Sequence, residues 1–79
     1  MSVDRSAGAN ARDLELWVNG EHRTVASSTT LAVLVAESVV GTRGIAVAVD
    51  GQVVPRSAWK RLRLMPGARV EIVTAAAGG

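Results

Sequence analysis

The sequence contains no cysteine, phenylalanine or tyrosine, and it has only one histidine, two tryptophans and two prolines. Without cysteine the chain has no disulfide scaffold, no cysteine-ligated zinc site and no thiol nucleophile. The single histidine, His22, excludes a histidine-rich metal cluster. The seven acidic residues are scattered, and no spacing pairs two carboxylates for acid–base chemistry. We therefore expect no bound metal or cofactor, and a protein that is not an enzyme in its own right.

Long apolar runs are also missing. No segment approaches the roughly 20 apolar residues that span a bilayer, and the first residues lack the apolar segment of a signal peptide. The absence of cysteine fits a reducing compartment, so we expect a cytoplasmic protein with no membrane partner. With 79 residues, of which 48% are hydrophobic, the chain has enough apolar side chains to form the core of one small domain.

Two polar or small-residue segments flank this domain. Residues 1–13 are rich in Ala, Gly, Ser and Arg and cannot offset their ordering entropy by burial, so they predict a disordered leader. Residues 14–73 carry the patterns of a folded domain. Residues 74–79 have no pattern that a core would need, and they predict a flexible tail.

The domain shows strand alternation, hairpin turns and one helical stretch. Asn19-Gly20 and Asp50-Gly51 are hairpin signals, because both turn positions favour positive φ. Pro66-Gly67 suits a turn with Pro second and Gly third, whereas Pro55 ends a strand. A helix from Leu31, capped by one of four Ser and Thr residues and ended by Gly41 or Gly44, follows the second strand. The expected elements are strands at 14–18, 22–26, 45–49, 52–54 and 69–73, with the helix at 31–40 and an irregular or short helical connection at 57–64.

This order predicts the α+β class. One main helix packs on one face of a mixed sheet of four to five strands, with the first and last strands side by side. The arrangement is the β-grasp, or ubiquitin-like, fold. We expect the apolar strand Ile45–Val49 to be covered on both faces.

The chain ends on Gly78-Gly79, preceded by Ala76 and Ala77. Glycine has no Cβ and adopts almost any backbone conformation, so such a tail can thread a narrow channel. Its carboxylate can then be activated by ATP in the active site of another protein and accept a sulfur or amine nucleophile. Frayed, glycine-rich termini are common, but here the tail follows directly on a strand expected at the centre of the sheet.

Two other features concern possible partner surfaces. The segment Arg56–Arg63 has four basic residues and Trp59, which would suit nucleic acid. With only two aromatic residues in the chain there is no stacking platform, so we favour a solvated connection with Trp59 against the core. Trp17 is expected opposite the core-facing residues of its strand, on the open sheet face, where an exposed aromatic marks a partner surface; packing under a loop or under the leader is an equal alternative.

Several motifs together resemble the ThiS family of thiamine-pathway sulfur carriers. The most specific is GIAVAVDGQVVPRSAW, from Gly44 to Trp59. The remaining similar segments are VNGE at 18–21, TL at 30–31, PGARVEIV at 66–73 and the final GG at 78–79.

The resemblance implies a specific activity. Gly79 would be adenylated by a ThiF-like activating enzyme with MgATP, and sulfur from a cysteine desulfurase would convert the adenylate into a thiocarboxylate. Thiazole synthase, a ThiG-like enzyme, would receive the sulfur. A ubiquitin-like protein modifier, a molybdopterin-synthase-type carrier and a small nucleic-acid-binding module remain the alternatives.

Overall fold

The computed structural model describes residues 13–39 and 44–74. Its elements are β1 (Asp13–Val18), β2 (Glu21–Ala26), α2 (Leu31–Ser38), β3 (Ile45–Val49), β4 (Gln52–Val53), the 3-10 turn η1 (Arg56–Ala58) and β5 (Arg69–Thr74). The tail residues Ala76, Ala77, Gly78 and Gly79, and nearly all of the expected leader, lie outside the described residues. Within the described part, no helix has the length and apolar character needed to cross a membrane.

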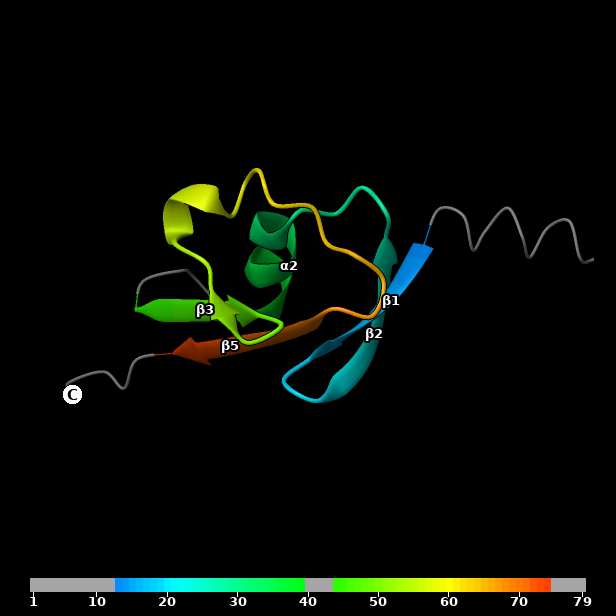
Figure 1. Cartoon of the computed structure of the whole chain (residues 1–79), viewed down its shortest axis with the longest axis horizontal. Helices are drawn as coiled ribbons and strands as arrows, with labels where there is room; N and C mark the ends of the chain where they lie inside the picture. The colour runs from blue at the N-terminus through cyan, green and yellow to red at the C-terminus, as the bar shows by residue number, and fades with distance from the viewer. Residues whose placement is uncertain (1–12, 40–43, 75–79) are drawn as a thin grey trace, which may run out of the picture.

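The five strands form one mixed sheet in the order β2-β1-β5-β3-β4. The first and last strands are parallel neighbours, with Trp17 opposite Arg69 and Val18 opposite Val70. All other pairs are antiparallel. β5 is therefore the central strand, and Figure 1 shows α2 and the connection from β4 to β5 on the same side of the sheet. This is the β-grasp architecture that the order of elements predicts.

The hairpin turns follow directly from local sequence. Asn19 and Gly20 have φ values of 52° and 85°, and Asp50 and Gly51 have 51° and 86°. Two successive positive φ values define the type I′ turn, whose twist matches that of the flanking strands. Gly67, at φ 80°, follows Pro66 in a turn closed by the Ala68 N–H on the Met65 carbonyl at 3.1 Å. Each of the three predicted turns is present.

The helix α2 begins where predicted but ends early. Thr30 is the N-cap, and its side chain accepts a hydrogen bond from the Val33 N–H at 3.4 Å. The expected extension to Val40 is wrong: Val39 is extended, at φ −138° and ψ 163°. The β-branched Val39 favours extended backbone, and the helix ends there; Gly41, one of the two expected end residues, lies outside the described residues. Gly44, at φ 69°, instead lies directly before β3.

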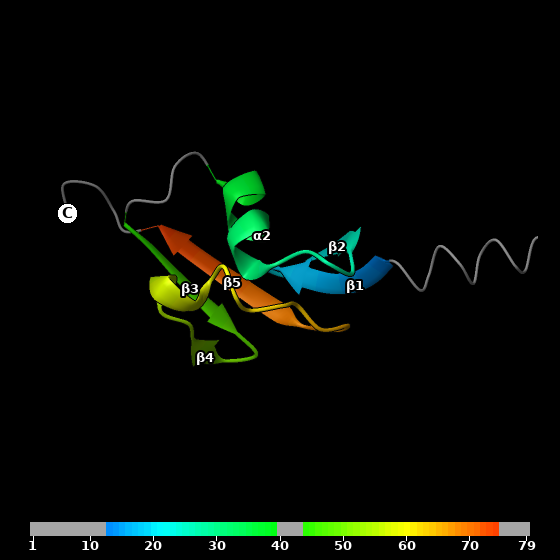
Figure 2. The same cartoon turned by 90° about the horizontal axis from the view of Figure 1, so that it is seen from above.

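The core lies between α2 and one face of the sheet. Figure 2, seen from above, shows α2 over the middle of the sheet, across β5. The alternating burial of β1, and of β5 as far as Ile72, places every second residue in this layer. The buried apolar residues are Leu14, Leu16, Val18, Leu31, Leu34, Val35, Val47, Trp59, Leu64, Ala68, Val70 and Ile72.

The expected cover on both faces of β3 is wrong. Only Val47 is buried in this strand, and Ala46 is exposed. The only α-helix of the described residues covers a single face, and no other described element covers the opposite face of the sheet. The short side chains of Ala46 and Ala48 lie on that open face, opposite Val73 and Glu71 of β5.

Four of the strands have one boundary that differs by a single residue from the sequence interpretation, among them β2, which begins at Glu21 instead of His22. β1 begins at Asp13, which had been assigned to the leader, and β5 extends to Thr74, which had been assigned to the tail. β4 comprises only Gln52 and Val53. Val54 still donates its N–H to the Val47 carbonyl at 2.8 Å, so the ladder ends at the residue before Pro55.

Candidate functional site

The end of β5 lies at the edge of the domain from which the tail continues. Thr74, the last residue of the strand, pairs with Ile45, the first residue of β3. Ile72 faces the core, whereas Val73 faces the open side and is 61% exposed. The chain is thus held in the central strand of the sheet until five residues before Gly79.

Trp17 lies on the open face of the sheet, opposite its core-facing neighbours Leu16 and Val18. The residue is 38% exposed, and its ring meets the His22 ring edge-on, with the centroids 5.3 Å apart and the planes at 74°. The cross-strand pairing of Trp17 with His22 in β1 and β2 produces this contact. Glu15 holds the other side of His22, with its carboxylate 3.2 Å from Nε2.

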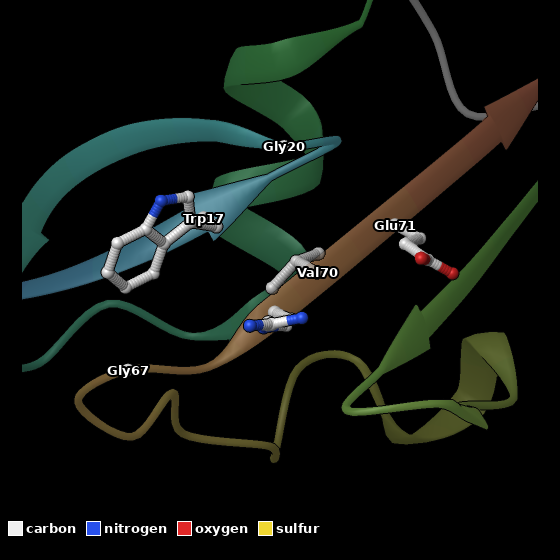
Figure 3. A pocket seen from close by; sticks show the side chains of 6 residues that line it. Trp17, Gly20, Gly67, Val70 and Glu71 are labelled. Atoms are coloured by element: carbon white, nitrogen blue, oxygen red, sulfur yellow. The ribbon is translucent and has the colours of Figure 1, made fainter.

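Two hollows flank Trp17. One, of about 400 Å³, is lined by Trp17, Gly20, Gly67, Arg69, Val70 and Glu71, and Figure 3 shows the Trp17 ring at one side of it and Glu71 at the other. The second, of about 460 Å³, lies toward Asp13 and Pro66. The aromatic ring therefore stands between two depressions of the open face, with a basic and an acidic side chain beside it.

The opposite end of the open face is aliphatic. Val53 is 76% exposed and lies across from Ala48, while Val73 lies across from Ala46. Together with Trp17 these side chains make up a surface that we call the open-face patch: Trp17, Ala46, Ala48, Val53 and Val73. Exposed aromatic and aliphatic groups gathered on one side of a small domain are typical of a protein-binding surface.

Trp59 has a structural position. It is buried, and its Nε1–H donates to the Val54 carbonyl at 2.9 Å. The Arg56 guanidinium lies 5.8 Å from the ring centroid, within cation–π range. A tryptophan enclosed in this way cannot stack on a base, so the Arg56–Arg63 segment lacks an aromatic platform, as the sequence interpretation favoured.

Among residues 13–39 and 44–74, no three His, Asp or Glu side chains lie close enough to hold a metal ion, and no charged side chain is buried. The described surface offers instead the open-face patch and the end of β5. Sequence reasoning found Trp17 but missed Val53 and Val73. The alternation that places Val70 and Ile72 in the core already assigns Val73 to the open face.

A five-stranded mixed sheet with one covering helix, an open face and a central last strand defines a β-grasp protein of the ubiquitin-like class. The model of the ThiS family matches residues 10–79. The chain therefore belongs to the ThiS family.

The chain is also similar to individual proteins, among them a solved structure and a curated relative. The crystal structure of the thiamine biosynthesis protein ThiS from Geobacter metallireducens superposes with a TM-score of 0.70 at 30% identity, over 84% of this chain and all of the other. A thiazole synthase from Paramagnetospirillum magneticum is 33% identical over 66 residues, which are 84% of this chain. The matched segment is 20% of the length of that thiazole synthase, so this chain spans about a fifth of it.

Proposed function

We propose that this protein carries sulfur for thiazole formation in thiamine biosynthesis, with the Gly79 carboxylate as the acceptor. The observation that carries the proposal is the family match, which continues through the described central strand β5 to residue 79. The carrier is a co-substrate of its partners and not an enzyme. It holds no cofactor, because the activating partner binds the MgATP.

The proposed chemistry has three steps. A Gly79 carboxylate oxygen attacks the α-phosphorus of ATP, and pyrophosphate leaves. The terminal sulfur of a cysteine-desulfurase persulfide then attacks the carbonyl carbon and expels AMP, which gives an acyl disulfide. A thiol reduces this disulfide, forms a new disulfide with the desulfurase sulfur, and releases the C-terminal thiocarboxylate.

The partners in this scheme are a ThiF-like adenylating enzyme, a cysteine desulfurase and a ThiG-like thiazole synthase. The similarity to part of a longer protein named thiazole synthase supports the last of these, because domains that act in succession are often joined in one chain. We expect the carrier to act in the cytoplasm, where MgATP is available.

The small residues Ala76, Ala77 and Gly78 suit a narrow channel, because they bring few or no side-chain atoms past the wall. The partner would supply every acid, base and metal for the reaction. The open-face patch would form the docking surface, since it lies on the side of the sheet that no other described element covers.

The test is mass spectrometry after incubation with the activating enzyme, MgATP and a sulfur donor. We expect one oxygen to be replaced by sulfur on the C-terminal fragment. Localisation by fragmentation is essential, because methionine sulfoxide has nearly the same mass change and Met65 is 66% exposed. An unmodified Gly79, with the activating enzyme competent on another carrier, would contradict the proposal; conjugates of higher mass would indicate a protein modifier.

Replacing Trp17 by Ser should weaken binding to the activating enzyme. A partly exposed tryptophan that becomes buried in an interface contributes about 2 kcal/mol or more, so we expect the Kd to rise on the order of thirtyfold. Isothermal titration calorimetry with the activating enzyme measures this Kd. ATP is left out so that binding is observed without adenylation.

The matched control for that variant is Val33→Ser. Val33 is also an exposed apolar residue, at 46%, but it lies on α2 rather than on the open face. Its substitution should leave the Kd within about twofold. Equal losses for the two variants would contradict docking through the open-face patch.

A further inference from the structure

The strand that leads to the tail loses its β1 neighbour early. β1 and β5 share only two register pairs, and the later one joins Val18 to Val70. After Val18 the chain turns away into β2, whereas β5 continues for four more residues to Thr74. A hollow of about 390 Å³ lies beside Thr74, at the edge of β5 that faces β1, and it is also lined by Val18 and Asn19.

The side chain of Asn19 extends the ladder by one more step. Its Oδ1 accepts the Ile72 N–H at 2.8 Å, and its Nδ2 donates to the Ile72 carbonyl at 3.2 Å. Its own backbone N–H donates to the Val70 carbonyl at 2.8 Å. The carboxamide has one donor and one acceptor group arranged like those of a peptide, so it occupies the place of the next β1 residue.

A second turn residue, Asp50, binds β5 at its first residue and from the edge that faces β3. Asp50, in the β3–β4 turn, accepts the Arg69 N–H on Oδ1 at 3.0 Å and donates its own N–H to the Arg69 carbonyl at 2.8 Å. Asn19 and Asp50 have nearly the same φ, 52° and 51°, and each precedes a glycine. The two contacts differ in position: Asp50 holds the start of β5, and Asn19 holds Ile72 near its end.

We propose that Asn19 is a positioning residue for the C-terminal tail, acting through Ile72. The inference rests on the proposed function, in which the open face docks and Gly79 must reach a distant active site. The five residues after Thr74 extend at most about 17 Å, so the direction of the strand end decides where their tip can reach. A strand held on both edges at Ile72 restricts that direction and raises the effective concentration of Gly79 at the reacting phosphate.

The test compares Asn19→Gly with Asp50→Gly in the full-length chain. Glycine retains the positive φ of each turn without strain, so each variant removes only a side-chain contact to β5. We expect both to lower the Tm by a similar amount, about 5 °C. Faster hydrogen exchange of the Ile72 amide, in Asn19→Gly alone, would verify that the intended contact is lost.

The decisive readout is the rate of pyrophosphate release by the activating enzyme, at a temperature where all variants are folded. For Asn19→Gly we expect kcat to fall on the order of tenfold with KM within about twofold, because docking is intact but Gly79 is poorly delivered. For Asp50→Gly both constants should stay within about twofold of the unmodified chain.

Three results would overturn the inference. Equal kcat values for the two variants would show that the Asn19 contact contributes stability alone. A rise in KM without a fall in kcat would mean that Asn19 acts in docking. If the activating enzyme released no pyrophosphate with the unmodified chain, the proposed function and this inference would both be overturned. The first two results would overturn only the inference about Asn19.

Discussion

Removal of Gly78 and Gly79 is expected to abolish sulfur loading while the domain stays folded. The last described strand ends at Thr74, and every buried core residue of the described chain precedes it. The deletion therefore leaves all of these core residues in the chain, but it withdraws the acceptor carboxylate by two residues, about 7 Å. The thiocarboxylate signal should fall below detection in the mass spectrum, with an unchanged far-UV circular dichroism spectrum.

A deletion of equal length at the other end is the matched control. Loss of Ser2 and Val3 removes two residues that the proposed chemistry does not use, and loading should be normal. If the chain without Gly78 and Gly79 still gained sulfur at its new terminus, the position of the acceptor would not be set by the length of the tail, and the channel model would be wrong.

Gly79→Ala probes the same channel more gently. The added Cβ keeps the carboxylate in place but needs space beside it and restricts the backbone. We expect adenylation to slow by about ten- to a hundredfold with folding unchanged. Adenylation at the normal rate would contradict a tight channel around the terminal residue, although it would leave the acceptor role intact.

Trp59→Ala is expected to be the most destabilising of the substitutions considered. Trp59 is only 4% exposed and donates a hydrogen bond to the Val54 carbonyl. Truncating a buried tryptophan costs about 3–5 kcal/mol, a large share of the stability of a small domain. Urea unfolding followed by circular dichroism should show a much lower midpoint or no folded baseline.

Two further variants separate packing from chemistry. Trp59→Phe retains a ring but leaves the Val54 carbonyl without its donor, and should cost about 1–2 kcal/mol with normal sulfur loading of the folded protein. Trp17→Ala, the matched truncation of the half-exposed tryptophan, should cost less than Trp59→Ala. A loading defect in Trp59→Phe without loss of stability would show that Trp59 contacts a partner.

Much of the fold could be predicted because its signals are local. Asn-Gly and Asp-Gly at two hairpins, Pro-Gly at the third turn and the period-two alternation of β1 and β5 each depend on a few neighbouring residues. The end of α2 and the cover of β3 could not be read in this way. Val39 is compatible with helix or strand until its neighbours decide, and an apolar strand has the same sequence whether one or two of its faces are covered.

The candidate site divides in the same manner. Alternation alone assigned Trp17 to the face opposite the core, and the structure places it there. The contacts of Asn19 with Ile72 join residues 53 positions apart, so the sequence showed only a turn residue. The sequence likewise does not show how the N-terminus of α2 is held, because the Leu31 and Ala32 N–H groups donate to the carbonyls of the distant residues Leu62 and Trp59.

The sequence by itself determined the turns, the strand periodicity, the start of the helix at Leu31 and the family to which the chain belongs. These depend on backbone preferences and side-chain patterns over a few residues. Only the tertiary structure decided that β3 is covered on one face alone, that Val53 lies on the same face as Trp17, and that Asn19 and Asp50 hold β5 from opposite edges. Such features depend on which distant segments become neighbours when the core forms, and no local pattern encodes them.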